Sequence, residues 1–343
     1  MATKIHKELN LSSTLLSIPE KKYTLYSTQT RTNIIDLIKN ILSQEIIDLI
    51  ELKNISWQGI ECPVTRARIW RLILGYESPI KESRPEDLQK KRMEYLEKLS
   101  TLKVPSKQKL SKKFISSLPK YELFKSQVVQ NSLLQLITLI SKDEKLRKKS
   151  TPAMIIPFFI IFLSEFYPID LETLEVHDEG PQKTYASIVE ADTYWCCTIF
   201  IRTYLNNKKN KVCESVIRAL EKFDSALLVH LNLECIRMSF LNRWVKYLFL
   251  KDFPLNICLR IFDELITNKS PKMILTKCNK DLSQKNFIVC LVCALFSIFR
   301  SQILMSKGPQ LENTMSKLPT DSWGEIEILI LVSQAYLYLS ILD

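Results

Sequence analysis

The sequence predicts an all-α protein, and three observations lead to this prediction. The 343-residue chain contains only five glycines, too few for a turn-rich β fold. Apolar residues make up 46% of the chain, enough to build a large core, which excludes wholesale disorder. These apolar residues recur at the spacing of helices rather than of strands. We therefore expect one large helical domain over residues 31–343, preceded by a polar N-terminal extension over residues 1–30.

The helices are expected in the order in which apolar stripes occur along the chain. Residues 34–52 predict an opening amphipathic helix. Residues 65–75 predict the second helix, with Thr65 as a possible cap and Gly75 as its stop. A charged surface helix is expected over 86–99, between prolines. Later helices are expected over residues 129–140, 156–167, 193–205, 212–223, 226–250, 255–266, 287–305 and 325–342.

The spacing of glycines and histidines excludes several classes of enzyme. The five glycines are never close enough to form a phosphate-binding loop, which excludes Rossmann dehydrogenases, P-loop NTPases and ordinary protein kinases. The three histidines, His6, His177 and His230, include no pair at the i, i+4 spacing of a helical zinc site. We expect neither a metal nor a cofactor.

Cysteines and hydropathy favour a cytoplasmic protein. Nine cysteines are scattered without a repeated spacing, as in proteins of a reducing compartment. The single C-x-x-C, Cys290 and Cys293, lies in an apolar run and is interpreted as two small residues of a buried helix. The N-terminus lacks the apolar region of a secretory signal. The two most apolar runs, 153–163 and 287–299, are shorter than the roughly 20 residues that cross a bilayer, so both are expected to form core helices.

The net charge of +11 is concentrated in residues 81–150, which hold 18 Lys and Arg against 8 Asp and Glu. Three interpretations remain open: a solvated basic surface, a patch for an anionic membrane or acidic partner, and a nucleic-acid groove. The segment has no regular alternation of basic and aromatic residues, and base stacking is therefore poorly supported. We expect no nucleic-acid partner.

Several blocks of sequence resemble, in order, the motifs of a known family. They are 52–60 (L-K-N-I-S-W-Q-G-I), 66–76 (R-A-R-I-W-R-L-I-L-G-Y), 90–95 (K-K-R-M-E-Y), 157–165 (P-F-F-I-I-F-L-S-E), 190–196 (E-A-D-T-Y-W-C), 240–252 (F-L-N-R-W-V-K-Y-L-F-L-K-D), 260–263 (R-I-F-D), 318–323 (L-P-T-D-S-W) and 335–336 (A-Y). Together they resemble the TBC-domain proteins that activate GTP hydrolysis by Rab GTPases, most closely the Golgi Ypt/Rab GAP branch. The resemblance covers roughly residues 46–338 and implies a single TBC-type helical domain.

Most of the motif residues allow a structural interpretation as well as a functional one. The five tryptophans, Trp57, Trp70, Trp195, Trp244 and Trp323, are of the size that fixes helix packing. Arg243 and Asp263 are able to bind each other or a helix end as readily as a partner. The resemblance makes a second interpretation available, in which residues of these blocks face the GTPase. Its candidates are Arg243, Trp244, Arg260 and Asp263.

The resemblance also implies a mechanism with two inserted side chains, an arginine from an I-x-x-D-x-x-R motif and a glutamine from a Y-x-Q-G motif. Residues 93–146 contain no arginine and residues 136–181 no glutamine, although both motifs belong in these intervals. Alignment from Leu123 places Lys113 at the aspartate and Ser116 at the arginine. Counting back from Pro157 places Lys149 at the glutamine, with Arg147 at the tyrosine. Lysine cannot make the planar bidentate contact of arginine, so Lys113 and Lys149 are poor substitutes.

Three functional hypotheses follow. The first is a pseudo-GAP that binds a small Rab GTPase in vesicle traffic without accelerating hydrolysis, with Lys113, Ser116, Arg147 and Lys149 among the GTPase-facing residues. The second is an active Rab GAP with substituted catalytic residues. The third is a helical scaffold that binds anionic membrane or protein through residues 81–150. All three place the chain in the cytoplasm, peripheral on Golgi or other endomembranes.

Overall fold

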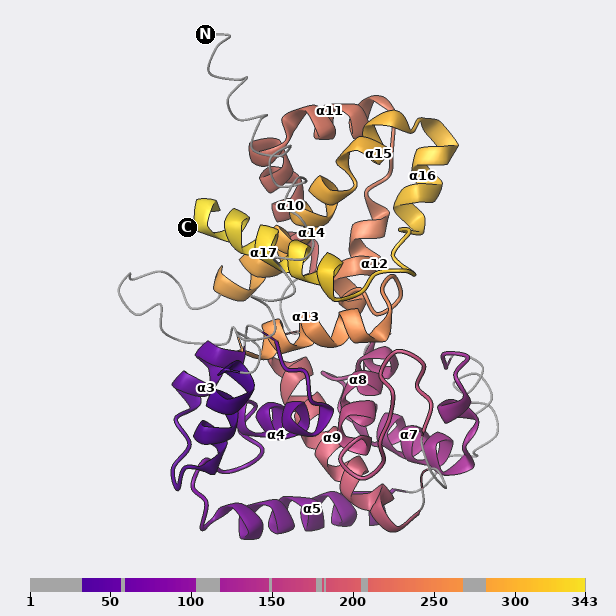
Figure 1. Cartoon of the computed structure of the whole chain (residues 1–343). Coiled ribbons are helices and arrows are strands. Elements are labelled where there is room, and N and C mark those ends of the chain that lie inside the picture. The colour runs from indigo at the N-terminus through magenta and orange to yellow at the C-terminus, as the bar shows by residue number, and fades with distance from the viewer. Residues whose placement is uncertain are drawn as a thin grey trace.

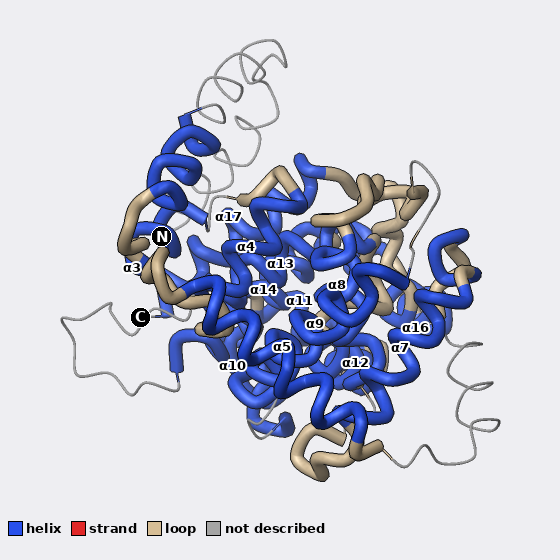
Figure 2. The backbone as a smooth tube through the Cα atoms, turned by 90° about the horizontal axis from the view of Figure 1, so that it is seen from below, coloured by secondary structure: helices blue, strands red, loops and turns tan. Residues whose placement is uncertain are grey.

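The computed structural model describes residues 33–56, 59–102, 118–147, 150–176, 181, 183–204, 209–267 and 282–342. These residues form helices joined by loops, and among them β pairing is limited to the isolated bridges Ile46 to Ile80 and Ile169 to Val176 (Figure 2). The prediction of an all-α fold is confirmed. The proposed extension over residues 1–30 lies outside the described residues. Within the described part of the chain, no helix combines the length and apolar character that a membrane crossing needs.

The helices form two lobes with one helix between them (Figure 1). The lobe drawn at the bottom contains α3 (Leu49–Ser56), α4 (Pro63–Ile73), α5 (Arg84–Ser100), the 3-10 helix η2 (Glu122–Lys125), α7 (Gln127–Ile140), α8 (Thr151–Leu163) and α9 (Lys183–Tyr204). The lobe at the top contains α10 (Lys209–Phe223), α11 (Ser225–Leu233), α12 (Ser239–Tyr247), α14 (Leu282–Ile298), α15 (Arg300–Met305), α16 (Gly308–Ser316) and α17 (Glu325–Leu342). Helix α13 (Leu255–Thr267) packs against α3, α4 and α8 on one side and α17 on the other, so it joins the two lobes.

Aromatic side chains fill the core where α13 meets the lower lobe. The rings of Trp70 and Phe158 lie 5.1 Å apart, and those of Phe200 and Phe262 lie 5.0 Å apart. All four side chains are fully buried. Since Phe262 belongs to α13 and the other three to α4, α8 and α9, this cluster holds four helices together.

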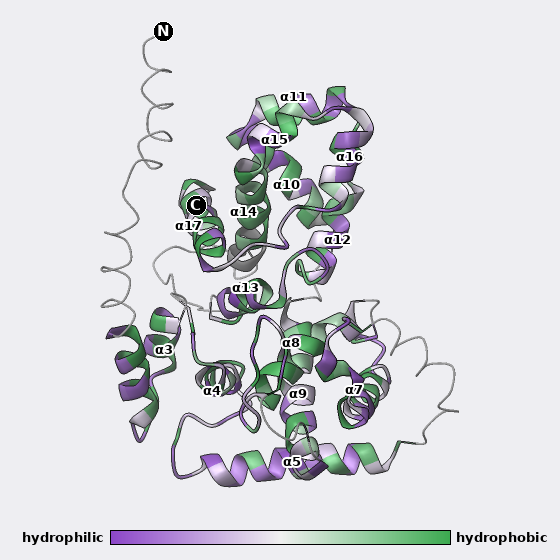
Figure 3. Cartoon of the chain, turned by 45° about the vertical axis from the view of Figure 1, so that its right-hand side comes forward, coloured by the Kyte–Doolittle hydropathy of each residue, from purple (hydrophilic) through white to green (hydrophobic). Residues whose placement is uncertain are grey.

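The two most apolar runs of the sequence form the buried helices α8 and α14, as predicted (Figure 3). Cys290 and Cys293 lie in α14 and are both buried. Burial raises the pKa of Cys293 to about 12, which keeps its thiol protonated and unreactive. The interpretation of this C-x-x-C as two small core residues is confirmed.

The predicted helix over 34–52 is wrong, because the chain forms one helix over 33–43 and a second, α3. Asp48 explains the new start, since its Oδ1 accepts hydrogen bonds from the backbone N–H groups of Ile50 at 2.8 Å and Glu51 at 3.1 Å. Thr65 is likewise not the cap of the next helix, which begins at Pro63 with Cys62 at the N-cap. The prediction of Gly75 as its stop is confirmed, since α4 ends just before this residue and Gly75 has φ +75°.

Two other predicted helices are each divided in two. Residues 226–250 form α11 and α12, and Cys235 with φ 55° lies in the turn between them. Residues 287–305 fall in α14 and α15. Apolar spacing does not reveal such breaks, because buried residues continue at helical intervals on both sides of the turn.

Candidate functional site

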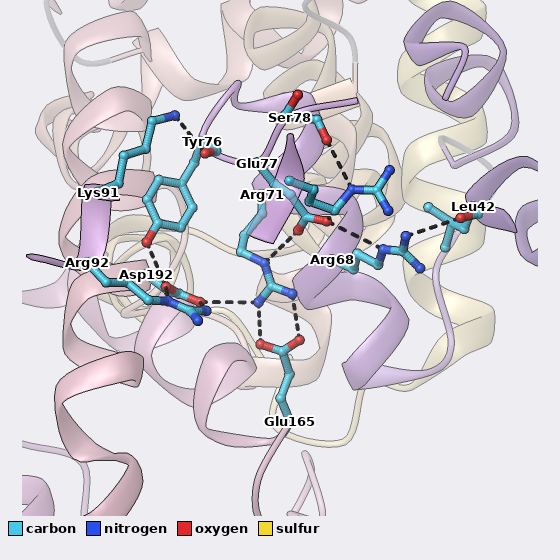
Figure 4. Close-up of polar contacts among 11 residues, drawn as sticks. Leu42, Arg68, Arg71, Tyr76, Glu77, Ser78, Lys91, Arg92, Glu165 and Asp192 are labelled. Carbon is cyan, nitrogen blue, oxygen red and sulfur yellow. Dashed lines mark hydrogen bonds and ion pairs between the residues drawn. The ribbon is translucent and has the colours of Figure 1, made fainter. Parts of the chain in front are cut away.

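Helix α4 carries a buried arginine that joins three carboxylates (Figure 4). Arg71 Nε donates to Glu77 at 2.9 Å, Nη2 donates to Glu165 at 2.8 Å, and Nη1 lies 3.3 Å from Asp192. The turn at Gly75 makes the first contact possible, since it folds the backbone N–H of Glu77 back onto the carbonyl of Arg71 at 3.0 Å. Glu165 follows α8 and Asp192 lies in α9, so one guanidinium connects three of the motif blocks.

A second arginine and a tyrosine complete this cluster around Asp192. Arg92 of α5 makes two hydrogen bonds with Asp192, of 2.9 and 2.8 Å, and Tyr76 donates its hydroxyl at 2.7 Å. Burial and the charge of Asp192 raise the pKa of Tyr76, so the tyrosine remains a neutral donor. Burial opposes the charged form of Arg71, but the carboxylates of Glu165, Asp192 and Glu77 raise its pKa overall. We name Arg71, Tyr76, Glu77, Arg92, Glu165 and Asp192 the α4 cluster.

Glu190, two residues before Asp192, lies in a separate buried environment. Tyr95 donates its hydroxyl to Glu190 at 2.9 Å. Burial raises the pKa of Glu190, while hydrogen bonds from Ser132 and Tyr95 oppose the shift.

The raised pKa of Glu190 predicts a specific pH dependence of stability. When the pH rises above 4.5, the ordinary pKa of a glutamate, the unfolded state loses the Glu190 proton while the native state keeps it. The free energy of unfolding therefore falls until the pH has passed the raised pKa of Glu190 in the native state. We expect Glu190→Gln to remove this fall. Urea unfolding between pH 4.5 and neutrality should show the variant gaining stability relative to the wild type as pH rises. A constant difference between the two proteins would contradict the prediction.

A second interior cluster lies where α4 meets α13. Asp263 is fully buried and accepts hydrogen bonds from Arg66 Nε at 3.1 Å and from Trp70 Nε1 at 2.8 Å. Arg260 pairs with Glu264 on the same helix, and Tyr336 of α17 donates to Glu264 at 2.6 Å. Burial raises the pKa of Asp263, although Arg66 and Arg260 oppose this shift. The cluster therefore connects α4, α13 and α17.

Arg243 lies at the edge of a cleft between the lobes. Its side chain pairs with Asp252 and donates to the carbonyl of Ser316, and it is about one-third exposed. The cleft has a volume of about 830 Å³. Tyr121 and Glu172 line it from the lower lobe, and Lys251 and Trp323 line it from the upper lobe. It is a concave surface with both signs of charge and an aromatic wall.

The structure separates the GTPase-facing candidates into three groups. Trp244, Arg260 and Asp263 belong to the interior: Trp244 and Asp263 are fully buried, and Arg260 is engaged with Glu264. Arg243 lines the cleft, and Arg147 is 63% exposed and lies 3.6 Å from Glu144. Lys113, Ser116 and Lys149 lie outside the described residues. Arg243 and Asp263 do not bind each other, since each has a different partner.

The tryptophans mostly follow the structural interpretation. Trp70 and Trp244 are fully buried. Trp195 is partly buried and donates its indole N–H to the carbonyl of Lys91 at 2.9 Å, and Trp323 stacks between Phe253 and Phe299. Trp57 lies outside the described residues. Sequence reasoning missed the cleft, because Tyr121, Glu172 and Lys251 share no pattern along the chain.

The motif residues thus assemble two buried networks in one two-lobed helical fold, and known proteins share this fold. The model of the Rab-GTPase-TBC domain family matches residues 63–304. The chain belongs to this family. The resemblance seen in the motif blocks is therefore confirmed.

Relatives of the family agree with this assignment. The chain is 25% identical to human TBC1 domain family member 22B over 323 residues, which cover 88% of this chain and 60% of that protein. It is 26% identical to the GTPase-activating protein GYP1 of Saccharomyces cerevisiae over 255 residues, covering 68% of this chain and 40% of GYP1. The chain thus spans about 60% or less of the length of these curated relatives.

Solved structures of TBC domains share the fold. The Ypt/Rab-GAP domain of Gyp1p superimposes with a TM-score of 0.76 at 23% identity, over 90% of this chain and 99% of that domain. A Chlamydomonas flagellar RabGAP TBC domain gives a TM-score of 0.60 at 13% identity, over 93% of this chain and 96% of that domain.

Proposed function

We propose that this TBC-domain protein binds a Rab-type GTPase in vesicle traffic without accelerating its GTP hydrolysis. One observation carries the proposal. The chain retains the residues that build the fold, including the α4 cluster. In contrast, residues 93–146, where the arginine of the family mechanism belongs, contain no arginine, and residues 136–181, where the glutamine belongs, contain no glutamine. The proposal includes peripheral association with the cytoplasmic face of Golgi or other endomembranes.

The missing side chains supply most of the chemistry in this class of reaction. An arginine finger neutralises the charge that develops on the transferred phosphoryl group and contributes roughly 10³ to 10⁵ in rate. A glutamine orients the attacking water. With serine and lysine at the aligned positions, Ser116 and Lys149, neither contribution is available.

The binding surface that we propose combines the exposed Arg147 with half-buried residues of the cleft walls. Arg147 is 63% exposed and precedes Lys149, and Tyr121 follows Ser116 at the lower wall of the cleft. Arg243 lies on the opposite wall. These cations suit the acidic and phosphate-bearing face of a nucleotide-loaded GTPase.

Single-turnover GTP hydrolysis by a panel of Rab proteins, with and without the chain, tests the proposal when binding to the GTP-loaded forms is recorded in parallel. We expect binding to at least one Rab with an unchanged hydrolysis rate. Arg147→Glu should weaken that binding severalfold. Lys81→Glu, a charge reversal at an exposed lysine that is not part of the proposed surface, should leave it unchanged.

Two other outcomes would contradict the proposal. Acceleration that disappears in Lys149→Ala would establish an active GAP with substituted catalytic residues. Absence of both binding and acceleration would favour the scaffold that binds anionic membrane or protein. Internal contacts weaken this last alternative, because Arg84 and Arg92 of the basic segment are engaged with Glu77 and Asp192.

A further inference from the structure

Helix α17 presents an apolar stripe to solvent. Ile326, Leu329, Ile330, Leu337 and Ile341 are each between 50% and 71% exposed. Their spacing places them on one side of the helix. The opposite side, with Ile328, Leu331, Val332 and Ala335, is buried in the upper lobe, where α17 packs against α14. Residues 328–342 contain no charged side chain, so the stripe is uninterrupted by charge.

Specific contacts fix the rotation of α17 about its axis. Tyr336 donates to Glu264 at 2.6 Å, and Gln334 donates to Ser297 at 2.8 Å. Tyr338 stacks on Phe223 with ring centroids 4.3 Å apart. The helix cannot turn to bury the stripe without breaking these contacts. A helix that is apolar on all sides belongs in an interior, which indicates that another surface covers this one.

The order of residues along the stripe is self-complementary. When two copies of α17 lie antiparallel about a twofold axis between Ser333 and Gln334, Ile326 faces Ile341 of the second copy, and Ile330 faces Leu337 of the second copy. The small Ser333 lies at the centre, where two helices approach most closely. Twofold interfaces require this kind of self-matching surface.

Charge at the ends of the helix agrees with the same arrangement. Glu325 and Glu327 lie in the first turn of α17, and Lys222 of α10 lies at its last turn, where its Nζ donates to the carbonyl of Ile341 at 3.3 Å. Glu327 lies three turns before Tyr338 and therefore on the side of α17 that meets α10. In the antiparallel pair, Lys222 of each copy then lies beside Glu327 of the other. We propose that α17 is a homodimerisation surface that pairs antiparallel with α17 of a second copy.

The small size of the surface favours a weak, reversible dimer over a permanent one. An 18-residue helix is about 27 Å long. A single pair of such helices gives an interface at the small end of the range for specific complexes. We therefore expect a reversible dimer with a dissociation constant on the order of micromolar.

Sedimentation velocity of the whole chain across a concentration series tests the dimer. We expect the average mass to rise from the 40.0 kDa of the monomer toward twice that value. Leu337→Glu should raise the dissociation constant of the dimer at least tenfold. The variant should therefore remain monomeric at concentrations at which the wild type dimerises. Leu233→Glu, at an exposed leucine of α11, is the matched control and should dimerise like the wild type. A wild type that is monomeric throughout would overturn the proposal.

A charge exchange tests the antiparallel register. Lys222→Glu alone and Glu327→Lys alone should each weaken the dimer, because each places like charges side by side at both ends. An equimolar mixture of the two variants should regain wild-type association, since the heterodimer restores both opposite-charge contacts. A mixture no tighter than the separate variants overturns this register. A different result would mean that a lipid surface occupies the stripe instead: the wild type floats with vesicles but does not self-associate, and Leu337→Glu abolishes the flotation.

Discussion

Replacing Arg71 with methionine is expected to lower the free energy of unfolding by about 3–5 kcal/mol. The change removes the cation that Glu77, Glu165 and Asp192 share. Arg92 remains beside Asp192, and Arg68 and Arg84 remain beside Glu77. Glu165 loses both of its hydrogen bonds from Arg71. An uncompensated carboxylate in a buried site is far more costly than the loss of an ion pair itself, because its desolvation is no longer offset. Urea unfolding at neutral pH, followed by far-UV circular dichroism, measures the loss.

The matched control for this variant is Arg300→Met. Arg300 also makes a two-bonded contact with a carboxylate, Asp224, but its side chain is 45% exposed. Water replaces the lost partner there, so we expect a loss below about 1 kcal/mol. Equal losses in the two variants would show that burial of the α4 cluster contributes nothing beyond an ordinary surface pair.

The sequence predicted the fold because the features that specify it are local. Apolar stripes with a helical period predicted α7, α10, α13 and α17 close to their observed bounds. The motif blocks predicted the family, and the structure supplies a physical reason for their spacing. Arg71 reaches Glu77 through the turn at Gly75 and reaches Glu165 and Asp192 across helix interfaces.

The partners of individual side chains were beyond sequence reasoning. Asp263 binds Arg66, which lies 197 positions away, and Arg243 binds Asp252 on the turn that follows its own helix. No periodicity distinguishes these pairings from others with the same charges. For the same reason, Trp244 and Asp263 were placed among GTPase-facing candidates although both lie in the interior.

The exposed stripe of α17 was hidden by the composition of the helix. Residues 328–342 carry no charge and have apolar side chains on every side of the helix, so the sequence gives no contrast between a buried face and an exposed one. Only the contacts of Gln334, Tyr336 and Tyr338 show which side faces the protein. Helices with strong amphipathic contrast, such as α10, do not present this difficulty.

The proposed function predicts that introducing the arginine and glutamine of the family mechanism converts the chain into an active GAP on any Rab that it binds. The variant combines Ser116→Arg with Lys149→Gln, the positions that align with the arginine and glutamine of the family mechanism. We expect single-turnover hydrolysis to rise by about 10³, the lower end of the range for an arginine finger. The lower end applies because Lys113 stands where the family motif has an aspartate, so adding Lys113→Asp should raise the rate further.

The matched control places the same charge one residue away, Ser117→Arg with Lys149→Gln. Catalysis by a finger depends on position to within about 1 Å, so this register should give almost no acceleration although the net charge is identical. Binding to the GTP-loaded Rab is measured for both variants, which separates a catalytic gain from tighter association. Equal stimulation by the two variants would show that charge alone acts. The Ser116→Arg, Lys149→Gln variant could also bind the Rab and leave its hydrolysis unchanged. That result would show that Ser116 and Lys149 are not the positions that correspond to the family's arginine and glutamine.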